Sequence, residues 1–172
     1  LVCHEGEFEQ LLGELALHHL DLVLAGQAAP RNPNLRLTCE RLIDSPVEWY
    51  GPARLVGKTE RDRFPQCLND LPVLLPTGHS ALRPTLDHWF EAQGLRPRIV
   101  GEFEDSALLA VFAARGLGVF PVSRLGADDI GLMRGLRVLG SSDGVKEEIH
   151  AIRSRRGHHH PLVLQVIAAA SR

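Results

Sequence analysis

A short polar turn follows an apolar run and precedes a segment with helical spacing of apolar residues. Its members are Thr77, Gly78, His79 and Ser80. Backbone N–H groups at the start of a helix attract anions, and hydroxyl side chains add directional hydrogen bonds. The turn therefore has the composition of an anion-contacting loop. The alternative is that Ser80 only caps the helix, and the two roles are compatible.

Three carboxylates precede the next apolar helical segment. They are Glu102, Glu104 and Asp105. Strand alternation puts Glu102 and Glu104 on one face, away from Phe103. Carboxylate oxygens are natural ligands of hard cations, so these residues are the candidates for a sodium site, and the identity of any metal stays unknown. The alternative is that Asp105 only caps the helix while the glutamates are solvated.

Two groups of histidines have the right side chains for metal or proton chemistry. The run His158–His160 precedes Pro161, and His18 and His19 end a predicted helix. The run suggests a transition-metal site, but consecutive residues rarely converge on one ion, so a solvated turn is the alternative. The helix-terminal pair suggests pH sensitivity or no special role.

Sequence motifs for catalysis are absent. The chain has no Gly-x-Ser-x-Gly elbow, no His-Glu-x-x-His helix and no phosphate-binding P-loop. The Gly116–Gly118 pair precedes a strand instead of opening a helix, so it is not a dinucleotide fingerprint. We therefore expect neither an enzyme nor a bound cofactor.

The bulk properties are those of a globular protein. The 172 residues are 44% hydrophobic and 23% charged, with a net charge of −2. The one small basic group, Arg153, Arg155 and Arg156, alternates as on the solvent face of a strand, so this chain itself is not expected to bind DNA. Three cysteines suit buried thiols in a reducing compartment, and no apolar run is long enough to span a bilayer.

Hydrophobic periodicity predicts alternating strands and helices, which is typical of an α/β fold. The predicted strands cover residues 1–4, 20–25, 35–42, 47–50, 73–75, 98–103, 117–120, 136–139 and 147–153. The predicted helices cover residues 5–19, 81–93 and 162–170, with a short helix between Ser106 and Gly116. Residues 127–135 are expected to form a loop or a short helix.

Helix-terminal signals sharpen these boundaries. Asp105 or Ser106 is suited to cap the short helix, and Gly116 occupies the position where a chain leaving a helix turns left-handed. Gly94 is suited to end the helix at 81–93 in the same way. The segment from Gly101 to Pro121 is therefore predicted to be one strand–helix–strand unit.

Four segments of the chain resemble the effector-binding domain of LysR-type transcriptional regulators. They are residues 20–25 (LeuAspLeuValLeuAla), 68–75, 82–94 and 108–121, the last with the family's glycine-rich strand ending in Pro121. Within the family, residues 101–108 and the helix end at 89–94 look most like the NhaR-type regulators, which activate expression of a sodium/proton antiporter in response to sodium.

This resemblance implies a two-lobed fold of the type II periplasmic-binding-protein kind. Lobe one would comprise residues 1–51 with 143–172, and lobe two residues 52–142. The family's winged helix-turn-helix, and the first strand and helix of lobe one, are expected to be absent from this chain. The resemblance implies that the absent strand and helix contribute to the effector site and to the usual dimer.

The resemblance also implies a sensory function. The two lobes would enclose a small-molecule or ion effector and so reposition DNA-binding domains in a cytoplasmic homo-oligomer, with no membrane partner. The implied effector-binding residues are Thr77, Gly78, His79, Ser80, Glu102, Asp105 and Ser106, with Ala25 and Gly26 from lobe one. The alternative function, from a different class of protein, is that of a solute-binding protein of a transport system, which shares this architecture.

Overall fold

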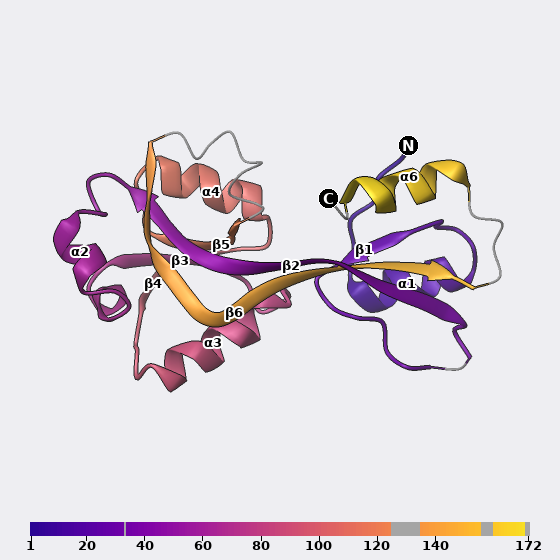
Figure 1. Ribbon diagram of the computed structural model, residues 1–172, viewed down its shortest axis with the longest axis horizontal. Coiled ribbons are helices and arrows are strands. Elements are labelled where there is room, and N and C mark those ends of the chain that lie inside the picture. The colour runs from indigo at the N-terminus through magenta and orange to yellow at the C-terminus, as the bar shows by residue number, and fades with distance from the viewer. Residues whose placement is uncertain (33, 125–134, 156–159, 171–172) are drawn as a thin grey trace. The chain divides into compact units, whose positions relative to one another are not determined.

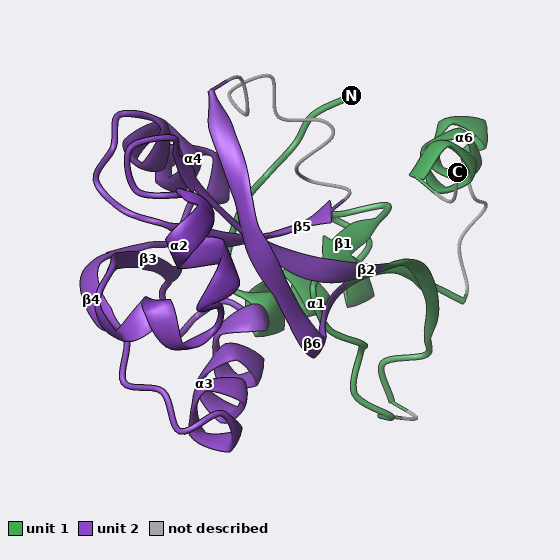
Figure 2. Cartoon of the chain, turned by 60° about the vertical axis from the view of Figure 1, so that its left-hand side comes forward, with its two compact units in different colours: residues 1–44, 148–172 green, residues 45–147 purple. Residues whose placement is uncertain are grey.

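The computed structural model describes residues 1–32, 34–124, 135–155 and 160–170. The chain divides into two compact units, unit 1 with residues 1–44 and 148–172, and unit 2 with residues 45–147 (Figure 2). Strands β2 (Leu37–Pro52) and β6 (Leu136–Ser154) have residues in both units. The lobe boundaries predicted after residues 51 and 142 fall inside these two strands and stay a prediction.

Unit 1 is built around helix α1 (Phe8–Ala16) and strand β1 (Val23–Ala25) (Figure 1). The helix presents apolar residues at helical spacing to the strands, and the buried core is Leu12, Leu15, Val23 and Ile152. Strand β1 pairs antiparallel with β6, with Val23 opposite Ile152 and Ala25 opposite His150. Helix α6 (Pro161–Ala170) follows β6 and begins at Pro161, one residue before the predicted start, because proline is well suited to the first helical position.

Unit 2 contains the remaining elements. They are α2 (Lys58–Asp62), the 3₁₀ helix η1 (Gln66–Asn69), β3 (Pro72–Pro76), α3 (Leu82–Ala92), β4 (Arg98–Phe103), α4 (Ser106–Ala114) and β5 (Phe120–Ser123). Strands β3 and β4 are parallel, while β5 pairs antiparallel with β2. The larger sheet has the strand order β1-β6-β2-β5.

Strand β3 is buried on both faces, which explains its continuous apolar sequence. Val73 and Leu75 pack in the larger core with Leu86 of α3, whereas Leu74 packs in a second core with Leu109 of α4. Helices α3 and α4 therefore cover opposite faces of the parallel pair (Figure 1). This arrangement confirms the predicted strand–helix–strand alternation in the middle of the chain.

The two longest strands were each predicted as two short ones. The strands predicted at 35–42 and 47–50 are continuous in β2. Pro46 lies just before Val47, the first β2 residue paired with β5, so its missing N–H costs no bond on that side. The strands predicted at 136–139 and 147–153 are likewise continuous in β6. There Ser142 is 1% exposed and accepts a 2.7 Å hydrogen bond from Trp49 Nε1 of β2, which holds the strand inside unit 2.

Other boundaries also differ from the prediction. The strand predicted at 20–25 begins only at Val23. Residues 1–4 form no strand, and Leu1 and Val2 are exposed. Helix α1 ends at Ala16 because His18 takes a positive φ of 62°. The strand predicted at 117–120 begins at Phe120 and runs through Pro121 to Ser123, whereas Val119 makes only a single bridge to Val73.

Most of the loop or helix predicted at 127–135 lies outside the described residues. Within the described part of the chain, no helix is long and apolar enough to cross a membrane.

Candidate functional site

The two predicted polar segments lie at one edge of the β3–β4 pair. Pro76, at the end of β3, is opposite Phe103, at the end of β4. The backbone N–H of Thr77 donates to the carbonyl of Phe103 at 3.0 Å, which continues the ladder by one residue. The turn 77–80 and the carboxylates at 104 and 105 therefore both follow the carboxyl ends of β3 and β4. This is the edge where parallel α/β sheets bind ligands.

The turn 77–80 closes on itself before α3 begins. The N–H of Ser80 donates to the Thr77 carbonyl at 3.1 Å, and Ser80 Oγ accepts from the N–H of Leu82 at 3.3 Å. Ser80 therefore satisfies one donor at the helix start. Within the described residues, the backbone N–H groups of Gly78 and Ala81 make no hydrogen bond, so they remain available to an acceptor.

The hydroxyl of Thr77 is the exceptional atom of this turn. Thr77 Oγ1 is shielded from solvent, and within the described part of the chain it has no hydrogen-bond partner. A buried hydroxyl without a partner costs about 1–3 kcal/mol, so native structures rarely keep one unless a ligand or water satisfies it. Gly78 beside it is exposed, and a side chain added there would meet nothing within 4 Å.

Arg83 ties the turn to both neighbouring elements. Its guanidinium donates to the Pro76 carbonyl at 2.9 Å, to the Asp87 carboxylate at 2.9 and 3.1 Å, and to Glu102 Oε1. The hydrogen bond to Glu102 raises the pKa of Arg83 from its ordinary value, against the opposing effect of burial. The charge of Glu102 is thus compensated from within the protein. This role of Arg83 was not predicted from the sequence, where the i, i+4 spacing of Arg83 and Asp87 on a helix was the available signal.

Asp105 caps helix α4. Its Oδ1 accepts from the N–H groups of Ala107 and Leu108 at 2.7 and 3.0 Å. The alternative capping role that the sequence allowed for Asp105 is therefore real, and Ser106 is the first residue of the helix instead.

Replacing Asp105 with alanine is expected to lower the free energy of unfolding by about 1 kcal/mol, because two helix donors lose their acceptor. The same change at the neighbouring exposed Ser106 is expected to cost less than about 0.5 kcal/mol. Urea denaturation followed by circular dichroism compares the two variants directly. Equal losses at both positions would contradict the capping role.

The predicted cation ligands are not arranged as a metal site in the described residues. Within the described part of the chain, no three His, Cys, Asp or Glu side chains are grouped to hold a metal ion. Glu102 pairs with Arg83, Asp105 caps α4, and Glu104 is exposed. The sodium site at these residues stays a prediction.

The histidines that were candidates for metal or proton chemistry lie in two places along the chain. His158 and His159 lie outside the described residues. His160 Nδ1 accepts from the N–H of Leu162 at 3.2 Å, so this side chain serves the start of α6. His18 and His19 are exposed after α1.

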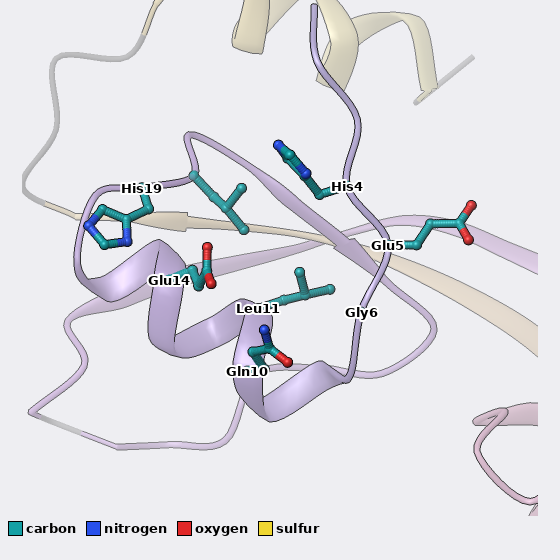
Figure 3. Close-up of a pocket in the computed structure, with 8 residues that line it drawn as sticks. His4, Glu5, Gly6, Gln10, Leu11, Glu14 and His19 are labelled. Atoms are coloured by element: carbon teal, nitrogen blue, oxygen red, sulfur yellow. The ribbon is translucent and has the colours of Figure 1, made fainter.

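In unit 1 the predicted residues Ala25 and Gly26 lie at and after the end of β1, where Ala25 is half-buried and Gly26 is exposed. A separate pocket of about 190 Å³ lies between the first residues of the chain and α1 (Figure 3). Its lining is polar and includes His4, Glu5, Glu14 and His19, but none of the predicted effector-binding residues. Its volume is below the range of about 300–1,000 Å³ typical of small-molecule sites.

Comparison with known proteins identifies the family. The LysR substrate binding domain model matches residues 1–172. The chain is 31% identical over 166 residues to the transcriptional activator protein NhaR of Escherichia coli strain K12, covering 96% of this chain and 54% of that protein. The chain thus spans about half the length of the curated relatives it matches.

Solved structures show the same fold. The cofactor-binding domain of the Cbl transcriptional regulator matches with a TM-score of 0.74 at 16% identity, over 96% of this chain and 72% of that one. The effector binding domain of QuiR in complex with shikimate matches with a TM-score of 0.64 at 14% identity, over 96% and 77%. The two-lobed type II periplasmic-binding-protein-like fold is confirmed, and the alternative of a transporter's solute-binding protein is wrong. The chain belongs to the LysR substrate-binding-domain family of transcriptional regulators.

Proposed function

We propose that this LysR-type regulatory domain senses a small anionic effector through the turn Thr77–Ser80. The observation that carries the proposal is the buried Thr77 hydroxyl without a partner at the start of α3. The N–H groups of Gly78 and Ala81 add two unused donors beside it. An oxygen-rich anion is the ligand that such a group of donors favours.

The effector must displace part of the turn to reach Thr77 Oγ1, because that atom is shielded from solvent. Gly78 and His79 are exposed, and the open space at Gly78 allows this movement. Effector binding would then favour the conformation in which the turn is rearranged. The related QuiR domain binds shikimate, a hydroxylated carboxylate, which supports the chemical class but not the identity of the effector.

In the whole regulator, we propose that this domain acts in the cytoplasm as part of a homo-oligomer. Promoter DNA would be bound by a helix-turn-helix domain outside these 172 residues. Likeness to the transcriptional activator NhaR makes activation of transcription the first property to test. The sequence resemblance to NhaR-type regulators adds a response to sodium. Glu102 and Asp105 remain the proposed sodium ligands, together with Glu104, although their present partners must be exchanged for the ion.

The test is Thr77→Val in the full-length regulator, titrated with shikimate and other small hydroxylated carboxylates. We expect the variant to bind the strongest ligand about tenfold more weakly, because one hydrogen bond to an anion is lost. Its ligand-free stability should be equal or higher, since an unsatisfied hydroxyl has been removed. Isothermal calorimetry gives the affinity and thermal unfolding gives the stability.

Thr85→Val is the matched control, because Thr85 lies on the exposed side of α3. Unchanged affinity in Thr77→Val would contradict the proposed contact. A separate titration of the full-length regulator compares sodium and lithium with potassium. If Glu102→Gln and Asp105→Asn leave a sodium response intact, the proposed cation ligands are wrong while the anion site is unaffected.

A further inference from the structure

A thiol, an imidazole and a carboxylate lie in line on strands β2 and β6 of unit 1. Cys39 Sγ is 3.6 Å from His150 Nδ1, and His150 Nε2 is 2.9 Å from Glu148 Oε2. Glu148 Oε1 in turn accepts from Arg41 at 3.0 Å. Residues two apart on a strand share a face, so Glu148 and His150 face one way on β6, as Cys39 and Arg41 do on β2.

The tautomer of His150 follows from its partners. A carboxylate only accepts hydrogen bonds, so His150 Nε2 carries the proton and donates to Glu148. His150 Nδ1 is then the acceptor that faces the Cys39 thiol. The bonds from His150 and Arg41 lower the pKa of Glu148, so this carboxylate stays charged and can stabilise an imidazolium.

The arrangement does not suit a metal ion. Cys39 and Glu148 approach opposite nitrogens of the same ring, so the three side chains cannot converge on one centre. The arrangement suits proton transfer instead. His150 is 7% exposed and its ring is held by two contacts, whereas Cys39 is exposed and can be reached by a reactant. A neighbouring base that is itself oriented by a third group is the arrangement that activates a nucleophile.

We propose that Cys39 is a modification site whose thiol, activated by His150, adds to α,β-unsaturated carbonyl compounds. The thiol proton passes to His150 Nδ1, and the sulfur forms a C–S bond at the β-carbon. The π electrons of the C=C bond move to the α-carbon, which takes the proton back from His150. The addition consumes one thiol and one electrophile and needs no oxidant or second reactant.

The chain contains its own controls for this reaction. Cys3 is an exposed thiol, and no hydrogen bond to it is found within the described residues. Cys67 is 1% exposed, and burial raises its pKa to about 11, so it stays protonated and covered. A faster reaction at Cys39 than at Cys3 therefore reports activation and not access alone.

The experiment treats the full-length regulator with a substoichiometric amount of N-ethylmaleimide at neutral pH and follows each cysteine by peptide mass spectrometry. We expect Cys39 to react about tenfold faster than Cys3, a modest effect for base assistance at a sulfur–nitrogen distance of 3.6 Å. Cys67 should remain unmodified. Equal or slower reaction at Cys39 would overturn the proposal.

Two variants test the role of the base. His150→Asn should bring the Cys39 rate down to that of Cys3, and Glu148→Gln should lower it about threefold because the imidazolium loses its counter-charge. Neither change should alter the rate at Cys3. Since His150 is buried and its replacement endangers folding, the half-exposed Glu148 provides the independent variant. A Cys39 reaction rate that is unchanged in Glu148→Gln, or in a folded His150→Asn, would show that His150 and Glu148 do not activate the thiol.

Discussion

Replacing Trp49 with alanine is expected to lower the free energy of unfolding by about 4 kcal/mol, as for other fully buried large aromatic residues. Trp49 is 0% exposed on β2 and belongs to the larger core of unit 2. Its ring centroid is 6.3 Å from that of Trp89 and 5.9 Å from that of Phe90. Alanine would leave a cavity that these two α3 residues cannot fill without moving the helix.

The indole N–H gives Trp49 a second role that a matched variant isolates. Trp49 Nε1 donates to Ser142 Oγ, whereas Trp89 Nε1 is buried and has no partner in the described part of the chain. Trp49→Phe should therefore cost about 1–2 kcal/mol more than Trp89→Phe, because only the former orphans a buried hydroxyl. Urea unfolding followed by far-ultraviolet circular dichroism measures both.

An equal cost for the two Trp→Phe changes would contradict a stabilising role of the Trp49–Ser142 bond. A loss of under about 1 kcal/mol in Trp49→Ala would contradict its contribution to the core. The bond also joins β2 to β6 within unit 2. Weakening it is expected to expose the amides of both strands to hydrogen exchange before those of β3 and β4.

The elements that could be predicted from sequence are those with local causes. Strand β4 has the predicted bounds, and helix α3 lies within one residue of its predicted ends. Gly94 and Gly116 both follow their helices with positive φ, because a left-handed residue there needs no information from elsewhere in the fold.

The features that the sequence did not reveal depend on distant partners. Strand β6 pairs with β1 and β2, and its hydrogen bond from Trp49 to Ser142 joins residues 93 positions apart. The contact between Cys39 and His150 joins residues 111 positions apart. The turn 77–80 was predicted from its composition, but the missing partner of Thr77 Oγ1 depends on everything that packs around it. Patterns of spacing cannot show such pairings.

Replacing Gly116 with alanine is expected to cost about 3 kcal/mol, from two separate causes. Gly116 has a φ of +94°, where a side chain adds strain of about 1–2 kcal/mol. A Cβ atom there would also lie 2.2–2.8 Å from the guanidinium of Arg54, which donates to the Gly116 carbonyl. Arg54 is exposed, so its side chain would swing aside and lose that charged hydrogen bond.

Gly94 separates the two causes. It has a φ of +64° after α3, and a Cβ atom there would meet nothing within 4 Å. Gly94→Ala should therefore cost only the backbone strain, about 1 kcal/mol. Placing Gly116→Ala in an Arg54→Met background should recover about 1 kcal/mol of its effect, because the bond to Arg54 is already absent. If Gly116→Ala costs the same in both backgrounds, Arg54 contributes nothing, and backbone strain alone requires glycine at this helix end.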